Sequence, residues 1–169
     1  QDGLTKVING DTTFEELIKA IDIDDADLTS KGLTESLEIA EKNNIEIIQT
    51  ELPRTESCSL FADNTYYIGL DSSLFGINEK IHLAHEVGHC VTGSMYNLYT
   101  PLDNRAKHEL RADRWAIKKL VPFNDLRTAI KKGIRECWEL AEFFNVTDEF
   151  MNNALKFYFN QGVLPRLFD

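Results

Sequence analysis

The spacing of apolar residues along the chain predicts helices first, then a short β-rich middle, then helices to the end. Thr12 or Thr13 precedes apolar residues at helical intervals, with Glu15 and Glu16 in the first turn, which is typical of a capped helix start. The same periodicity predicts a second helix over residues 34–43. The chain is therefore expected to open with two helices.

Three segments rich in β-branched and aromatic residues follow these helices. They cover residues 45–50, 57–62 and 65–70. Pro53 and the turn pair Asp63-Asn64 separate them. We therefore expect a small antiparallel sheet.

Helical periodicity returns after Leu70 and continues to the end of the chain. The predicted helices cover residues 78–91, 103–121, 124–132, 136–144 and 147–160. The predicted fold class is α+β, mostly helical, with the small sheet in front of the helix over residues 78–91. We divide the chain into a core over residues 1–122 and a helical C-terminal subdomain over residues 123–169, packed on that core.

Length, composition and charge narrow the classes of function. The 169 residues are 43% hydrophobic and 27% charged, as in an ordinary globular chain of about one domain. A net charge of −10 without a basic stripe argues against direct binding of nucleic acid. No apolar run approaches the roughly 18 to 20 residues of a membrane span. The first residues lack the basic and apolar regions of an export signal, so a cytoplasmic location is expected.

The three cysteines, Cys58, Cys90 and Cys137, show neither C-x-x-C pairing nor the spacing of a zinc knuckle. This pattern fits a reducing compartment. Cys90 directly follows His89. We expect Cys90 to be a small buried side chain, with a redox or metal role as the alternative.

One short motif has the chemistry of a metal site. Residues 83–90, LAHEVGHC, contain H-E-x-x-H in a segment that is predicted to be helical. Residues four apart project from the same side of a helix, so His85 and His89 can bind one metal ion. Glu86 lies about 100° further round the helix and can reach a water on that ion. These are the parts of a zinc hydrolase in which Glu86 is the general base and then the proton donor to the leaving amine.

The next predicted helix offers a third ligand. Glu109 and Asp113 lie one turn apart on a stripe that also holds the small residues Ala112 and Ala116. Gly88 gives similar clearance on the motif helix. We assign Glu109 as the third ligand and Asp113 as the carboxylate that hydrogen-bonds a ligand histidine and fixes its tautomer. The reverse assignment and a purely structural ion pair are the alternatives.

Three neighbouring residues are weaker candidates. His82 shares a helix face with His85, but three histidines along one helix do not easily surround one ion, so we expect His82 either to support the site without touching the ion or to pack against it. Tyr96 and Tyr99 follow the motif closely enough to stabilise an oxyanion, although ordinary packing is the expected role.

The two motifs together resemble the ImmA/IrrE family of zinc metallopeptidases. The family pattern is H-E-x-G-H followed by E-x-x-A-[ND]-x-[FW]-A, and this chain has HEVGH and then ELRADRWA. The resemblance covers roughly residues 34–122. It implies a zincin-like fold, a bound Zn²⁺ ion and a gluzincin-like arrangement in which Glu109 completes the site. Arg111 departs from many family patterns, which place an acid at that position.

The resemblance also implies a biological role. ImmA-type proteins, encoded in phages and integrative elements, inactivate a partner helix-turn-helix repressor by site-specific proteolysis. The expected substrate is therefore a protein, a cognate transcriptional repressor. A zinc-bound regulator that acts by contact without proteolysis is the alternative, because Glu86 is present in both cases.

Residues 138–155 resemble a helix-turn-helix and suggest a third class of function, a DNA-binding protein. The helix that would enter the groove begins with Asp148 and Glu149, and Lys156 is its one cation. Such a surface repels phosphates. We therefore interpret this unit as a scaffold or a partner-docking subdomain.

Overall fold

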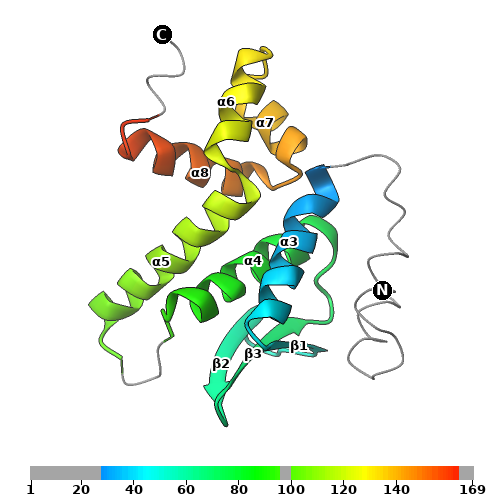
Figure 1. Cartoon of the computed structure of the whole chain (residues 1–169), viewed down its shortest axis with the longest axis vertical. Coiled ribbons are helices and arrows are strands. Elements are labelled where there is room, and N and C mark those ends of the chain that lie inside the picture. The colour runs from blue at the N-terminus through cyan, green and yellow to red at the C-terminus, as the bar shows by residue number, and fades with distance from the viewer. Residues whose placement is uncertain (1–27, 96–99, 164–169) are drawn as a thin grey trace.

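The computed structural model describes residues 28–95 and 100–163 and has an α+β fold (Figure 1). Within these residues, six helices and three strands follow one another in the predicted order. Their bounds are α3 Leu28–Lys42, β1 Ile45–Thr50, β2 Ser57–Ala62, β3 Thr65–Asp71, α4 Gly76–Thr92, α5 Leu102–Leu120, α6 Phe123–Lys131, α7 Cys137–Phe144 and α8 Asp148–Asn160. The helix predicted behind Thr12 and Thr13 lies outside the described residues. Among the described helices, none combines the length and the apolar composition needed to cross a membrane.

The three strands form one mixed sheet in the order β1-β3-β2. β2 and β3 form an antiparallel hairpin in which Ala62 pairs with Thr65. Asp63 and Asn64 between them have φ values of 49° and 62°, and two successive positive φ angles are what a two-residue type I′ turn requires. β1 and β3 are parallel, so the expectation of an antiparallel sheet is wrong for this pair.

The central position of β3 explains this difference. The chain reverses between β1 and β2 and again between β2 and β3, and β3 enters the sheet between the other two strands. Ile68 and Leu70 of β3 are almost completely buried, whereas their partners Ser59 and Ser57 on β2 are polar. The more apolar strand therefore occupies the centre and the serine-bearing strand the edge. Turn residues alone do not determine this order.

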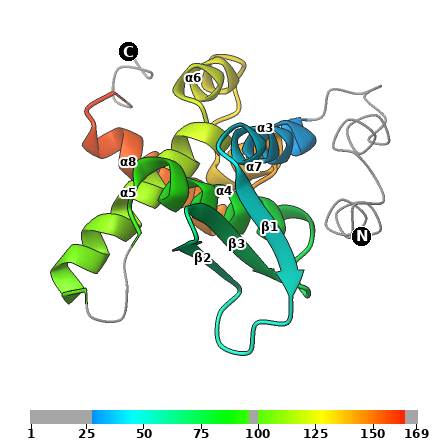
Figure 2. The ribbon, with the colours of Figure 1, turned by 60° about the horizontal axis from the view of Figure 1, so that its bottom comes forward.

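α3 and α4 cover one face of the sheet (Figure 2). Side chains from both helices, from β1 and β3, and from the loop before α4 meet there in one apolar cluster. Its buried members are Leu37, Ala40, Ile45, Ile68, Leu70, Leu74, Leu83, Val87 and Cys90. Because α4 buries Leu83 and Val87 in this cluster, its rotation about its own axis is determined, and with it the direction of the HExxH side chains.

A second apolar cluster joins α5 to the C-terminal helices α6, α7 and α8. Two buried hydrogen bonds reinforce it. The hydroxyl of Tyr158 on α8 donates to the carbonyl of Val121, at 2.7 Å. The ammonium group of Lys80, a buried residue of α4, donates to the carbonyl of Phe144 at the end of α7, at 3.1 Å. The helix that bears the HExxH motif is thereby tied to the C-terminal helices.

α4 and α5 approach each other most closely at Gly88. A Cβ atom at this position would lie 2.9 Å from the carbonyl oxygen and 3.1 Å from the Cα of Ala112. Ala112 and Ala116 are completely buried. The clearance expected from these three small residues is therefore present, and it brings the two motif-bearing helices into contact.

We expect Gly88→Ala to lower the free energy of unfolding. Overpacking against a backbone costs about 1–3 kcal/mol, which outweighs the roughly 1 kcal/mol that alanine gains over glycine in a helix. Urea titration measures the difference. The matched control is Gly32→Ala on α3, where the new Cβ would meet the Cδ2 end of the Leu120 side chain, which can rotate away. Equal stability of the two variants would contradict the prediction.

Candidate metal centre

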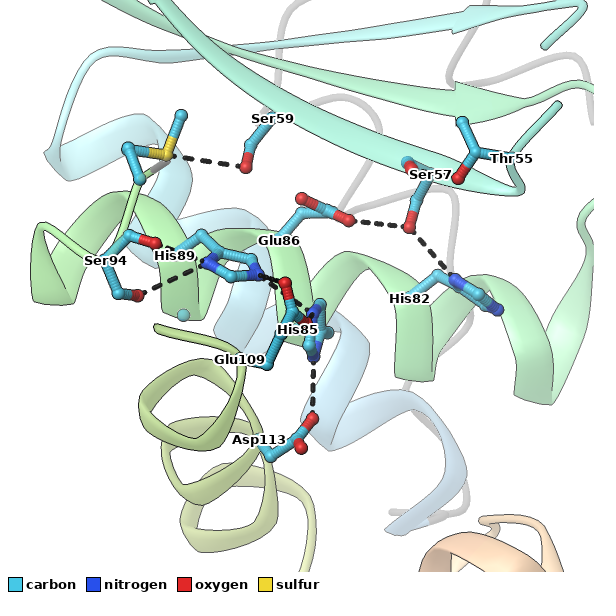
Figure 3. A network of polar contacts seen from close by, with 12 residues as sticks. Thr55, Ser57, Ser59, His82, His85, Glu86, His89, Ser94, Glu109 and Asp113 are labelled. Atoms are coloured by element: carbon cyan, nitrogen blue, oxygen red, sulfur yellow. Dashed lines mark hydrogen bonds and ion pairs between the residues drawn. The ribbon is translucent and has the colours of Figure 1, made fainter. Parts of the chain in front are cut away.

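The HExxH residues lie on α4 where it faces both β2 and α5 (Figure 3). α4 ends at Thr92, because Gly93, the residue that follows, has the left-handed conformation, with a φ of 61°. Glu86 and His89 are buried, each 5% exposed, and His85 is half-buried. The helix therefore presents all three side chains in one partly enclosed place.

His85, His89 and Glu109 converge on one point. The Nε2 atoms of the two histidines lie 3.0 Å apart. The carboxylate oxygens of Glu109 lie 3.2 Å from Nε2 of His85 and 3.6 Å from Nε2 of His89. In a tetrahedral zinc site with bonds of about 2.0–2.1 Å, ligand atoms are about 3.3 Å apart. The structure thus brings the three expected ligands together with the spacing of a metal site.

The outer ring nitrogens of both histidines are held by acceptors. Nδ1 of His89 lies 2.9 Å from the backbone carbonyl of Ser94, a buried residue that follows the end of α4. Nδ1 of His85 lies 3.0 Å from Oδ1 of Asp113, one turn beyond Glu109 on α5. A carbonyl or carboxylate only accepts, so each ring donates from Nδ1 and, when neutral, has its lone pair on Nε2. Two lone pairs that face each other repel unless a cation lies between them, so the donor set fits a metal ion.

The charges around His85 favour its protonated form in the metal-free protein. Burial of the ring lowers its pKa. The hydrogen bond with Asp113 and the charges of three neighbouring carboxylates together outweigh burial and raise the pKa above the ordinary value of 6.5. In the metal-free protein this contributes stability below pH 6.5, and the contribution is lost as the pH rises through the raised pKa. Zinc needs the neutral ring, so zinc affinity has the opposite dependence and falls as the pH falls through that pKa.

We expect Asp113→Asn to weaken zinc binding at pH 8 by about 10- to 100-fold, because the carboxylate orients the His85 ring and strengthens it as a ligand. The variant also loses one of the charges that raise the pKa of His85, so its affinity falls less steeply between pH 8 and pH 6. Competition with a chromophoric chelator measures both quantities. Complete loss of zinc here, with zinc retained in Glu109→Gln, would instead assign the ligand role to Asp113.

A cavity of about 410 Å³ opens beside the three converging residues. It is lined by Thr55, Ser57, Cys58, Ser59, His82, His85, Glu86, His89, Met95 and Glu109. Oε1 of Glu86 accepts a hydrogen bond of 2.7 Å from Ser57. The candidate base and the candidate ligands therefore face the same space, which is open to solvent and large enough for a segment of a substrate.

Sequence reasoning missed the residues that β2 and the end of α4 contribute. Ser57 and Ser59 lie on the face of β2 that is turned toward α4, and the carbonyl of Ser94 orients His89. The one local signal was the alternation of serines in a segment otherwise suited to a buried strand. Nothing local indicated that this strand lies beside α4.

The remaining candidates have different outcomes. Cys90 belongs to the apolar cluster under α4, and burial together with the charge of Glu86 raises the pKa of its thiol to about 12, so the thiol stays protonated and inert. His82 lines the cavity and makes polar contacts with Ser57 and Glu56, and it is not one of the three residues that converge as ligands. Tyr96 and Tyr99 lie outside the described residues.

Comparison with known proteins agrees with these motifs. The family model Peptidase M78, described as an IrrE N-terminal-like domain, matches residues 40–156. No curated protein and no solved structure gives a significant match. The family match covers more than half of the chain and includes both the HExxH helix and the helix of Glu109. The resemblance found in the sequence is thereby confirmed, and the chain belongs to the Peptidase M78 family of IrrE N-terminal-like domains.

Proposed function

We propose that the chain is a zinc-dependent endopeptidase that hydrolyses a peptide bond in a protein substrate, a cognate helix-turn-helix transcriptional repressor. The observation that supports the hydrolase is the meeting of His85, His89 and Glu109 beside Glu86 in one open cavity. Membership of a peptidase family supports the peptide bond as the target. The repressor rests on the resemblance to ImmA-type proteins.

Different residues are proposed to bind the metal ion, to orient its ligands and to transfer the proton. His85, His89 and Glu109 hold the metal ion, and Asp113 and the Ser94 carbonyl keep both rings oriented toward it. When bound, zinc lowers the pKa of a coordinated water to about 7 and polarises a carbonyl group. Glu86 accepts the proton from the attacking water and returns it to the nitrogen of the leaving amine. The buried position of Glu86 keeps this carboxylate beside the reacting groups.

The charges of the helix-turn-helix-like unit disfavour the DNA-binding alternative. α8 begins with Asp148 and Glu149, both exposed, in its first turn. A negative first turn repels the phosphates that a recognition helix must approach. Asn145, in the left-handed conformation, ends α7, and the buried side chains of α7 and α8 pack with those of α5 in one apolar cluster. This unit is proposed to support the core or to dock the substrate.

Cleavage products test the proposal directly. The zinc-loaded protein is incubated with a candidate cognate repressor and, separately, with a peptide library, and new N-termini are identified by mass spectrometry. We expect one major cut in the repressor, and none when a chelator has removed the metal. Cleavage of library peptides alone would support the peptidase but contradict the repressor as its substrate. No cleavage of either by the zinc-bound protein would favour the regulator that acts by contact.

A further inference from the structure

A line of polar contacts leads from the general-base candidate Glu86 toward the surface, and Figure 3 shows its first part, from Glu86 through Ser57 to His82. Ser57 Oγ lies 2.7 Å from Oε1 of Glu86 and 3.0 Å from Nδ1 of His82. The other ring nitrogen of His82 lies 3.3 Å from Oε2 of Glu56, whose side chain is 70% exposed. We call these four residues the Ser57 network.

Two segments that are separated in the sequence bring the Ser57 network together. Ser57 begins the edge strand β2, and Glu56 precedes it directly. His82 and Glu86 lie one turn apart on α4, on the face turned toward β2, so a single hydroxyl can contact both. Pairing of Ser57 with Leu70 of β3 holds the strand in register beside the helix.

The chemistry of the groups determines the direction of each hydrogen bond. An ionised carboxylate only accepts, so the hydroxyl hydrogen of Ser57 points to Glu86. Because that hydrogen is used, the contact with His82 requires the ring form that carries a proton on Nδ1, which then donates to a lone pair of the same oxygen. A serine hydroxyl by itself rotates among several directions, and a donor on its other side removes this freedom. His82 therefore sets the direction in which Ser57 donates.

The bond from Ser57 leaves half of the Glu86 carboxylate available. Within the described residues, Ser57 is the one hydrogen-bond donor to Glu86, and the bond is to Oε1. Oε2 is not engaged by any described side chain or backbone group. The side chain is buried and borders the same cavity as His85, His89 and Glu109. One oxygen is thus held while the other is left for a proton.

We propose that Ser57, and His82 acting through it, are positioning residues that hold the Glu86 carboxylate toward the metal centre. The proposal rests on the proposed function, because it gives Glu86 its role as the base. The hydrogen bonds that carry it do not depend on a metal or a substrate. They are therefore tested separately from the activity.

The first experiment measures coupling between Glu86 and His82 in the metal-free protein. Nitrogen–proton correlation spectra resolve the rings of the four histidines. We expect Glu86→Gln to shift the Nδ1 resonance of His82, and we expect this shift to be lost when Ser57→Ala is also present. Ser59→Ala is the matched control, because Ser59 shares the strand face but bonds Met95, at 3.5 Å, and not Glu86. An Nδ1 chemical shift of His82 that is the same in Glu86→Gln and in the wild type would overturn the proposal.

The second experiment measures turnover by the zinc-loaded protein. Its substrate is a fluorescence-quenched peptide that spans the cleavage site identified by mass spectrometry. We expect Ser57→Ala to lower kcat by roughly 10- to 100-fold with KM changed by no more than about twofold, since a misplaced base slows the chemical step. Zinc per chain stays the same. Ser57→Thr keeps a hydroxyl and is expected to restore kcat to within about threefold of the wild type.

The two experiments separate the two proposals. An unchanged kcat in Ser57→Ala would overturn the positioning role. Equal losses in Ser57→Ala and Ser57→Thr would also overturn it, because they would show that packing matters and the hydroxyl does not. A wild-type chain that cleaves no peptide, with the coupling of His82 to Glu86 intact, would contradict the peptidase and support the positioning of Glu86.

Discussion

Glu86→Gln is expected to abolish proteolysis while zinc stays bound. The substitution removes the group that accepts and returns the proton, and general acid–base catalysis contributes roughly 10²- to 10⁴-fold to a rate. The ligands His85, His89 and Glu109 are unchanged, and the amide oxygen of Gln can still accept from Ser57. Cleavage rate and zinc content, measured on the same preparation, check the two halves of this expectation.

The matched control for this variant is Glu79→Gln, the same substitution two turns earlier on α4. Glu79 accepts a hydrogen bond from Gln49 on β1 and lies outside the residues that line the cavity. It should leave the cleavage rate and the zinc content close to those of the wild type. If Glu86→Gln lost cleavage but still inactivated the repressor, the contact-dependent regulator would be the correct function.

Removal of a ligand is expected to have the second large effect, on zinc itself. The wild type should retain about one zinc per chain after dialysis against metal-free buffer, whereas His85→Ala and Glu109→Ala should retain almost none, because a catalytic zinc site has about three protein ligands. Elemental analysis gives the stoichiometry. His108→Ala is the control, since His108 is adjacent to Glu109 on α5 but is not one of the three converging residues.

Zinc should also stabilise the wild type and not these variants. A ligand present at 100 times its Kd stabilises the folded state by about 2.7 kcal/mol, which corresponds to roughly 5 to 10 °C in Tm for a chain of this size. Thermal unfolding with and without zinc measures the shift. An equal shift in Glu109→Ala would show that the metal binds elsewhere and would contradict the assigned site.

Much of the fold was predictable because its signals are local. The strands over residues 45–50 and 57–62 begin and end where predicted, and the later helices differ from their predicted bounds by a residue or two. Apolar periodicity indicates a helix from neighbouring residues alone. Helix ends and turns are equally local, as the positive φ angles at Gly93, Asn145 and the pair Asp63-Asn64 show. The order of the strands was not local, and there the prediction of an antiparallel sheet was wrong for β1 and β3.

The candidate site divides in the same way. Four-residue spacing on one helix is enough to place His85 and His89 side by side, and the stripe of Ala112 and Ala116 was enough to indicate the contact that brings Glu109 to them. Ser57 and Ser94 could not be found in this manner. Their roles depend on how β2 and the end of α4 lie in space.

By itself, the sequence determined the helices from α4 onward, the two motifs, the family and the chemistry that H-E-x-x-H makes possible, because each depends on residues close together in the chain. The start of α3 was not determined, because the helix expected over residues 34–43 begins at Leu28. The tertiary structure alone decided that β3 is central, that β2 borders the cavity, and that the Ser94 carbonyl orients His89. These contacts join segments whose approach depends on packing of the whole core, and packing is a property of all the buried side chains together.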